Sequence, residues 1–546
     1  MEKTTVVKKS TSKKIATKVV PVAVKSAIPL TGNVEPEVKP ELIPETKLDI
    51  QEEVASEIKP EINLEAKPET TPVIKRSDFN TVSEKFLKKK LNGTNTNLLV
   101  PKPFSTNTLN TTSINIKPSN NYEKDKIAKA MTLRELDEKS IMDLRKIAET
   151  LDVQDSPNYT KNDLIIKILE EQTKRGGNIF AEGVLEIIND GSHGVLRSLK
   201  MLPGNNDVYV SGSQIKRFNL KPGDFISGQA RAPKEGERYL SMLRIEAINN
   251  SSPDDALKRP TFSKLTPMFP NSQIKLETES HILSTRLIDL LCPIGKGQRG
   301  MLVSPPKVGK TWLLKEIADG ITKNHPEIHL MVVLVGERPE EVTDMERSVH
   351  GEVIAANFDE PPELHTKIAE MAIERAKRIV ETGKDVVILM DSLTRLARAY
   401  NITAPPSGRT LSGGFDPVAI YPPKRFFGAA RNFEDGGSLT VIATALVETG
   451  SRMDEVIFEE FKGTGNMELK LDRRLAEKRI YPAIDVKASG TRNEDKLLSA
   501  DVLNSSWRVR RMLDIFKDDE ATTMIIDRLK KTKTNKEFLS TLHEDL

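Results

Sequence analysis

The chain has 546 residues, of which 29% are charged and 5% are aromatic, and its formal net charge is +3. This near balance excludes a globally basic nucleic-acid binder, so any nucleic-acid surface must be local. The single cysteine, Cys292, excludes an internal disulfide framework and favours a reducing compartment such as the cytoplasm. No apolar run approaches the roughly 20 residues that span a bilayer, so we expect no membrane partner.

Residues 1–129 are expected to be a disordered, low-complexity extension. They repeat the triplet Lys-Pro-Glu at Lys39, Lys59 and Lys67 and contain no Cys, His or Trp. Such a composition cannot bury enough apolar area to offset chain entropy. The segment is either a solvated spacer or a weak tether for RNA or protein. Its start lacks the arginines and the apolar core of a targeting signal.

Two small domains are predicted next. Residues 130–176 carry apolar side chains at helical spacing, which predicts a small helical domain. Residues 177–248 contain five short alternating runs between Gly and Pro turns, which predicts an OB-like or cold-shock-like barrel. Such barrels bind single-stranded nucleic acid by stacking bases on aromatic side chains. Tyr209 and Tyr239 are the candidates here, with core positions an equal alternative.

Residues 249–285 have the composition of a connector, and residues 286–546 alternate strands with helices. This alternation predicts a mainly parallel sheet covered by helices on both faces. In such sheets ligands bind at the carboxyl ends of the strands. The functional residues of this domain are therefore expected at the carboxyl ends of its strands.

The strongest local motif is a strand, a loop and a helix with Gly309-Lys310-Thr311 at the junction. Amides at a helix N-terminus face phosphates, Lys310 adds charge at the β and γ positions, and Thr311 can ligate Mg²⁺. Ser304 stands where the first glycine of such a loop is usual. The motif predicts an ATP site.

Two acids end neighbouring buried strands. Asp391 follows an apolar run and fits a Walker B acid that holds Mg²⁺ directly or through water. Glu337 is placed to polarise the attacking water as a general base. The alternative for Glu337 is an ordinary surface acid.

Two later segments are too rich in Gly and Pro to be regular elements. Residues 404–416 carry Arg409, and residues 449–452 follow another strand. Both could line a channel if the domain assembles into a ring, and Arg492 would then be an arginine finger. Taken alone, each loop is better interpreted as a plain connector.

Longer strings carry a family resemblance. They are GKGQRG (295–300), PPKVGKT (305–311), ERPEEVTDM (337–345), DSLTRLARAYN (391–401), PKRFFGAARN (423–432), EEFKGTGNMEL (459–469) and SGTR (489–492). With these strings the chain resembles the bacterial transcription termination factor Rho family, which are RecA-type hexameric RNA helicases. The resemblance covers about residues 131–530. It implies a multidomain fold that ends in a RecA-like α/β P-loop ATPase domain.

The resemblance also implies roles for individual residues. Glu337 matches the catalytic glutamate, Asp391 the Walker B acid, Lys310 the P-loop lysine and Arg492 the finger from the next subunit. The implied ATP contacts are Gly295, Lys296, Gly297, Gln298, Arg299, Gly300, Lys307, Val308, Gly309, Lys310, Thr311, Trp312 and Arg338. The implied barrel contacts with RNA are Gly191, Ser192, His193, Gly194, Val195, Leu196, Arg197, Asp207, Val208, Tyr209, Glu237, Arg238 and Tyr239. The implied channel contacts are Arg409, Thr410, Leu411, Ser412, Gly413, Gly414 and Arg452.

The implied function is that of an ATP-dependent, RNA-stimulated hexameric translocase and 5′–3′ helicase. It would bind nascent single-stranded RNA and terminate transcription by acting on the elongating RNA polymerase complex, with elongation-factor cofactors. The implied setting is the cytoplasm. Two alternatives stand beside it: a rotary-ATPase-type ring subunit, and an RNA-binding module with an inactive ATPase.

Three departures from the family pattern bear on function. The first barrel segment, residues 191–197, has no Phe, and His193 either stacks in its place or is a plain turn residue. Losing stacking platforms is expected to reshape RNA preference, since each stacked base contributes about 1–3 kcal/mol. Arg409 and Arg452 stand where lysines are usual, and Gly336 replaces an acid before the catalytic glutamate.

Overall fold

The computed structural model describes residues 131–153, 156–174, 179–188, 191–204, 206–234 and 236–541. The extension expected over residues 1–129 lies outside these ranges. Among the described residues, no helix combines the length and the apolar character that a membrane span requires.

Three short helices open the described chain, and their caps explain where they start. Thr132 and Glu135 form a reciprocal capping box, and Ser140 accepts the N–H of Asp143 at the next helix. Buried Leu136 and Leu164 pack in one hydrophobic cluster with side chains of the barrel. The helical domain therefore shares its core with the barrel. The helices are α2 (Leu133–Asp137), α3 (Ile141–Thr150) and α4 (Lys161–Lys174).

The barrel is closed, with strand order β1-β2-β3-β5-β4, which confirms the predicted five-stranded architecture. Strand β4 alternates buried and half-buried residues, as a barrel wall requires. Gly228 permits the close approach of β5, since a Cβ there would lie 2.1 Å from the carbonyl oxygen of Arg244. The elements are β1 (Ile179–Ile188), β2 (His193–Arg197), β3 (Val208–Ser211), α5 (Gly212–Arg217), β4 (Phe225–Arg231) and β5 (Leu240–Ile248).

The connector packs onto the α/β domain. Phe262 meets Phe433 edge-to-face at 5.1 Å between ring centroids. Strand β6 pairs with β13 of the main sheet, so the connector adds a strand to it. The elements are α6 (Pro253–Lys258), η3 (Phe262–Lys264), β6 (Pro267–Met268), β7 (Gln273–Ile274), β8 (Ile294–Gly295) and β13 (Arg431–Phe433).

The α/β domain is built on a nine-stranded sheet whose main path runs β11-β10-β12-β14-β9-β15-β16. The pairs along this path are parallel except β15 with β16. Strand β10 is buried almost throughout, as expected for a parallel strand covered on both faces. The strands are β9 (Arg299–Ser304), β10 (His329–Glu337), β11 (Glu352–Asn357), β12 (Asp385–Asp391), β14 (Ser438–Leu446), β15 (Met467–Lys470) and β16 (Gly490–Thr491).

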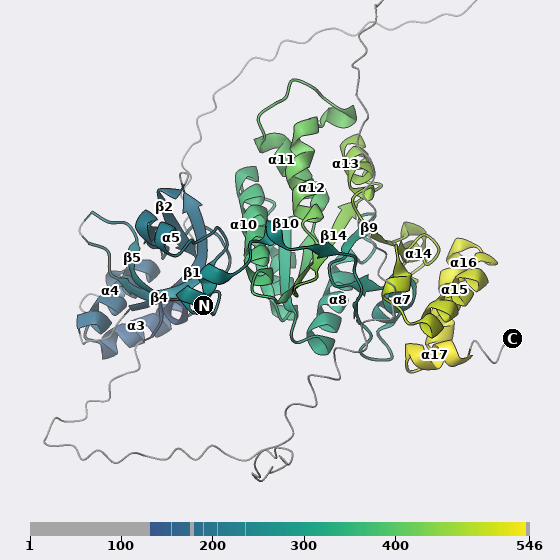
Figure 1. Cartoon of the computed structure of the whole chain (residues 1–546), viewed down its shortest axis with the longest axis horizontal. Coiled ribbons are helices and arrows are strands. Elements are labelled where there is room, and N and C mark those ends of the chain that lie inside the picture. Colours follow the sequence, from purple (N-terminus) through teal and green to yellow (C-terminus); the bar gives the residue numbers. More distant parts are fainter. Residues whose placement is uncertain are drawn as a thin grey trace, which may run out of the picture. The chain divides into compact units, whose positions relative to one another are not determined.

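Helices cover both faces of this sheet (Figure 1), and two separate hydrophobic clusters fill the two sides. One side holds α10 (Pro362–Val380), α11 (Leu393–Thr403), α12 (Tyr421–Gly428) and α13 (Arg452–Lys462). The other holds α7 (Leu283–Leu291), α8 (Lys310–Asn324), α9 (Pro339–Ser348), α14 (Arg473–Glu477), α15 (Ala500–Asp514), α16 (Asp518–Leu529) and α17 (Asn535–Thr541). The short turns η4 (Ser412–Gly414), η5 (Pro417–Ile420) and η6 (Glu494–Lys496), with η1 (Ser156–Asn158) between α3 and α4, complete the described elements. The predicted α/β class is confirmed.

Candidate functional site: a nucleotide site and two nucleic-acid surfaces

The phosphate-binding loop joins β9 to α8. Lys307 and Gly309 have φ of 66° and 97°, the left-handed conformation that turns successive amides toward one side. Ser304 is the last residue of β9 and fully buried, and its Oγ donates to the carbonyl of Pro305 at 2.8 Å. Since this position lies in a strand, a serine is accommodated there without a left-handed backbone.

Three strand ends meet the start of α8. The Lys310 Nζ lies 2.6 Å from Oδ1 of Asp391 and 3.1 Å from Oε1 of Glu337. The hydroxyl of Thr444, on β14, donates to the same Asp391 oxygen at 2.7 Å. The carboxylates are almost completely buried, with 2% of the Asp391 side chain and 4% of the Glu337 side chain exposed. The structure therefore brings together the side chains that the sequence placed at separate strand ends and in the phosphate-binding loop.

The electrostatics of this cluster favour a charged lysine and a basic glutamate. Burial alone would lower the pKa of Lys310, but the facing Asp391 and Glu337 outweigh it and raise the pKa. Burial, reinforced by repulsion from Asp391, raises the pKa of Glu337 above its usual range. A raised pKa makes Glu337 a better proton acceptor than a free glutamate, which suits a general base.

The residues present fit a magnesium ion. The Thr311 hydroxyl lies at the start of α8 and donates to Oε2 of Glu341 at 3.4 Å. Hydroxyl and carboxylate oxygens are ligands that Mg²⁺ prefers, usually one or two from the protein with the rest from phosphates and water. Thr311 and Asp391 supply such a set.

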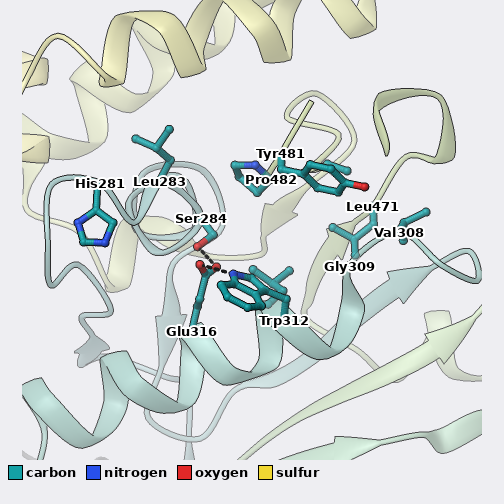
Figure 2. A pocket seen from close by; sticks show the side chains of 12 residues that line it. His281, Leu283, Ser284, Val308, Gly309, Trp312, Glu316, Leu471, Tyr481 and Pro482 are labelled. Atoms are coloured by element: carbon teal, nitrogen blue, oxygen red, sulfur yellow. Dashed lines mark hydrogen bonds between the residues drawn. The ribbon is translucent and has the colours of Figure 1, made fainter. Parts of the chain in front are cut away.

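A pocket of about 460 Å³ opens beside the loop (Figure 2). The rings of Trp312 and Tyr481 line it, with Val308 and Leu471. Glu316 accepts the indole N–H of Trp312 at 2.7 Å. Flat apolar walls next to a phosphate loop fit a nucleobase. Sequence reasoning included Trp312 but missed Tyr481, because Tyr481 comes from a distant segment without a recognisable motif.

The structure also gives a reason for the glycine at position 336, where the family pattern has an acid. Its φ is 68°, the register with β11 shifts at this point, and a Cβ would lie 3.2 Å from Cδ of Arg395. The Arg395 guanidinium reaches Oε1 of Glu337 at 3.3 Å. The glycine thus leaves room for a second cation beside Glu337. Arg395 lies on α11, four residues after Asp391 at the end of β12, and this closeness in sequence to the strand end was the signal that could have revealed it.

The segment Gly295–Gly300 lies at the amino ends of the parallel strands, whereas the phosphate-binding loop lies at their carboxyl ends. Lys296 pairs at 2.7 Å with Asp385, the first residue of β12, whereas Asp391 is its last. Since a strand rises about 3.3 Å per residue, the two ends of β12 are roughly 20 Å apart. The structure therefore does not bring Gly295–Gly300 to the P-loop of the same chain, and the ATP contact of this segment stays a prediction. Arg338, by contrast, caps α9 directly after Glu337.

Arg492 lies at this same far edge, directly after β16. Its N–H donates to the carbonyl of Asn466 at 2.9 Å, and the N–H of Arg299 donates to the side chain of that asparagine, also at 2.9 Å. Burial, together with the nearby charges of Arg431 and Arg492, lowers the pKa of Arg299. We call Arg299, Arg431 and Arg492 the arginine edge. It carries positive charge on the side of the sheet away from Lys310.

One outer face of the barrel carries the predicted RNA contacts Tyr209 and Glu237–Tyr239. They line a pocket of about 490 Å³ together with Arg231. Arg231 donates to both oxygens of Glu237, at 2.7 and 2.9 Å, and with the N–H of Lys234 this holds the pKa of Glu237 at about 2. His193 stacks on Tyr209 with 5.6 Å between centroids and 24° between planes. This stack is made within the barrel, so whether His193 also stacks on a base stays a prediction.

Other predicted RNA contacts on the barrel are buried instead. The Arg197 side chain is 7% exposed, bonds Glu186 at 2.6 Å and forms a second ion pair with Asp207. Val195, Leu196 and Val208 belong to the hydrophobic interior. These side chains stabilise the strands that present Tyr209, and their direct contact with RNA stays a prediction.

The two loops predicted to line a channel lie against each other. Gly413 has φ of 77°, and a Cβ there would lie 2.5 Å from the amide nitrogen of Met453, so η4 packs directly on the start of α13. Buried Asp454 accepts two bonds from Arg398, at 2.8 and 2.7 Å, which ties α11 to α13. Arg409–Gly414 and Arg452 remain exposed. The side chains of Arg409 and Arg452 are therefore accessible to a polyanion.

Three family models match successive parts of the chain. The Rho termination factor N-terminal domain matches residues 135–177, and the Rho termination factor RNA-binding domain matches residues 181–254. The nucleotide-binding domain of the ATP synthase alpha/beta family matches residues 284–491. The three matches follow the helical domain, the barrel and the α/β domain.

Full-length relatives align over most of the chain. Transcription termination factor Rho of Bacillus subtilis is 53% identical over 417 residues, covering 76% of this chain and 97% of its own. The factor of Thermotoga maritima is 55% identical over 419 residues, covering 76% and 98%. That of Pseudomonas aeruginosa is 54% identical over 417 residues, covering 76% and 99%.

Proposed function

Because this chain belongs to the transcription termination factor Rho family, we propose that it is an ATP-driven, RNA-stimulated translocase and 5′–3′ helicase that terminates transcription. The observation that carries the proposal is the presence, in one chain, of the Lys310–Glu337–Asp391 cluster and the aromatic barrel face around Tyr209. The first is suited to hydrolysis of a nucleotide and the second to a single-stranded nucleic acid.

Hydrolysis would proceed by attack of water on the γ-phosphorus. The bond between that phosphorus and the β–γ bridging oxygen breaks, and Glu337 accepts the proton of the attacking water. Lys310 would leave the two carboxylates to contact the β and γ phosphates, while the amides of the loop bind their oxygens. Mg²⁺, held by Thr311 and Asp391, would neutralise charge on these phosphates.

The position of Arg492 supports a ring. An arginine at the edge opposite to Lys310 cannot reach a nucleotide on its own chain, but it would face the nucleotide of a neighbour in a closed assembly. We therefore place the arginine edge of one subunit against the P-loop of the next in a homohexamer. The predicted ATP contacts of Gly295–Gly300 then stand as contributions from the neighbouring subunit.

RNA would be held at two places. The barrel face would load nascent single-stranded RNA, and the exposed segment Arg409–Gly414 with Arg452 would grip its backbone in the central channel. The proposed protein partners are the RNA polymerase elongation complex and elongation-factor cofactors, in the cytoplasm. These partners follow from the termination role and not from a surface that we describe.

Both alternatives are less well supported. A rotary-type ring subunit would explain the match to the ATP synthase alpha/beta nucleotide-binding domain, but not the matches to the Rho N-terminal and RNA-binding domains. An RNA-binding module with an inactive ATPase is disfavoured by the paired Lys310, Glu337 and Asp391.

The test is the rate of ATP hydrolysis against a set of homopolymer RNAs, with a mass measurement that counts subunits. We expect pyrimidine-rich RNA to raise turnover of a hexamer. Lys310→Ala should abolish hydrolysis and leave RNA binding by the barrel intact. A homogeneous preparation whose turnover does not respond to any RNA would contradict the proposal.

A further inference from the structure

A buried charge cluster lies where the barrel, the connector and α10 meet. Its centre is Glu381, which follows α10 and whose side chain is completely buried. Its carboxylate pairs with Arg378 at 3.1 Å, Arg259 at 3.2 Å and Lys221 at 3.3 Å. It also accepts the N–H of Phe262 at 2.8 Å. Lys221 comes from the barrel, Arg259 and Phe262 from the connector, and Arg378 from α10.

The barrel contributes a second buried carboxylate, Asp224. The guanidinium of Arg259 donates to it at 2.7 Å, and the amide of Asn249 donates to it at 2.8 Å. Arg375 of α10 donates to Asn249 at 3.3 Å. One connector arginine thus bonds a carboxylate of the barrel and Glu381 of the α/β domain at the same time.

A close backbone contact between the barrel and α10 lies beside this cluster. Gly223 has φ of 84°, and a Cβ there would lie 2.4 Å from the amide nitrogen of Arg375. The Arg375 guanidinium lies over the ring of Phe225 at 5.1 Å. A barrel turn therefore rests directly on the backbone of α10, and a shift of the barrel must displace the helix.

The other end of α10 lies near the nucleotide site. His365 bonds the carbonyl of Asn357 at 2.8 Å, and its Cε1 lies 3.6 Å from the place of a Cβ on Gly336, the residue before Glu337. The helix has 19 residues, so at 1.5 Å per residue it is about 28 Å long. The strand that follows Glu381 is β12, which ends at Asp391.

The cluster is not fully satisfied in this arrangement. Among the described residues, Nη1 of Arg259 and Nε of Arg378 are buried without a hydrogen-bond partner. Unpaired buried donors are unfavourable, so a movement that brings an acceptor to either of them would be favoured. A helix that moves in this way would carry a displacement from one end to the other.

We propose that Glu381 is a positioning residue that couples RNA binding at the barrel to nucleotide binding at Lys310, with α10 as the connecting lever. The proposal rests on the function proposed above. Burying several charges is favourable only with good mutual geometry, so the cluster transmits a movement of the barrel instead of absorbing it. Neither Glu381 nor its partners touch the nucleotide site, so its effect is on coupling and not on chemistry.

The test is a linkage experiment on the full chain. The Kd of a labelled oligocytidine is measured with and without a non-hydrolysable ATP analogue, and the Kd of the analogue with and without the RNA. In the wild type we expect each ligand to change the affinity of the other by the same factor, about 5–150-fold. In Glu381→Gln that factor should fall to near 1, while the Kd of the RNA alone stays that of the wild type.

Two further variants make the result decisive. Glu363→Gln makes the same chemical change on an exposed position of the same helix and should keep the wild-type coupling. Lys221→Met removes only the barrel's cation, so it should lose part of the coupling, and it decides the matter if thermal melting shows that Glu381→Gln is unfolded.

Failure of this inference is distinguishable from failure of the proposed function. A wild-type chain that bound no RNA would overturn the proposed function. A wild-type chain that bound both ligands independently, or wild-type coupling in both Lys221→Met and Glu381→Gln, would overturn only the role of Glu381.

Discussion

The nucleotide site and the barrel face proposed to bind RNA differ in how far their side chains are buried. Lys310, Glu337 and Asp391 are buried and paired with one another. Tyr209 and the Glu237–Tyr239 segment stand on an outer surface with open space beside them. Chemistry on a phosphate requires groups held in place in advance, whereas a strand of varying sequence requires accessible stacking surfaces.

The largest effect is expected from a variant that tests whether the nucleotide site is complete within one chain. Arg492→Ala should lower RNA-stimulated turnover by about 10³–10⁵-fold, the range for an arginine finger. When the Arg492→Ala and Lys310→Ala chains are co-expressed, mixed assemblies should regain turnover. Each variant retains the half of the shared nucleotide site that the other lacks. Steady-state ATP hydrolysis measures both. Arg511→Ala, an exposed arginine on α15, is the control. A mixture no more active than either variant would argue against a shared site.

The second prediction concerns the proton acceptor in the buried site. Glu337→Gln should lower turnover by about 10²–10⁴-fold with nucleotide affinity retained, because a glutamine cannot take a proton. Since the pKa of Glu337 is raised, kcat/KM of the wild type should fall with falling pH already above the usual glutamate range. The acid limb is measured from pH 5 to 8, with the exposed Glu340→Gln as control. A profile that stays flat to pH 5 would remove Glu337 from this role.

The third prediction turns to the buried part of the barrel. Arg197→Met leaves the Asp207 carboxylate buried without its guanidinium partner and should lower the free energy of unfolding by about 3–5 kcal/mol. Denaturant titration measures the loss, and Arg244→Met, at an exposed position of β5, should show little change. Unchanged stability with weakened RNA binding would instead restore Arg197 as a direct contact.

The smallest expected effect is on the open face. Tyr209→Ala should weaken RNA binding by about 1–3 kcal/mol, or roughly 5–150-fold in Kd, by removing one stacking surface. ATP hydrolysis at saturating RNA should be unaffected. Phe180→Ala, an exposed aromatic on β1 outside this pocket, is the matched control. Equal losses in both variants would mean that Tyr209 acts through the barrel's stability.

The residues that the sequence placed at strand ends, and that the structure brings together, share a feature: their position is set by local chain order. A buried strand followed by an acid, or by a loop and Gly309-Lys310-Thr311, positions its functional group whatever the rest of the chain does. Tyr481 and Arg395 were missed because they reach the site only through tertiary packing. The family pattern assigned Arg197 and Gly295–Gly300 to ligands, but it carries no information on burial or on which subunit a contact belongs to.

The hydrophobic cluster shared by the helical domain and the barrel has a consequence for how this region comes apart. Leu136 and Leu164 lie in the same interior as Leu185 and Ile226, although separate family models match the two segments. Two segments with one interior unfold as one cooperative unit. Deleting α2–α4 would strip apolar cover from the strands, so the smallest portable RNA-binding fragment begins at the first helix and not at the first strand.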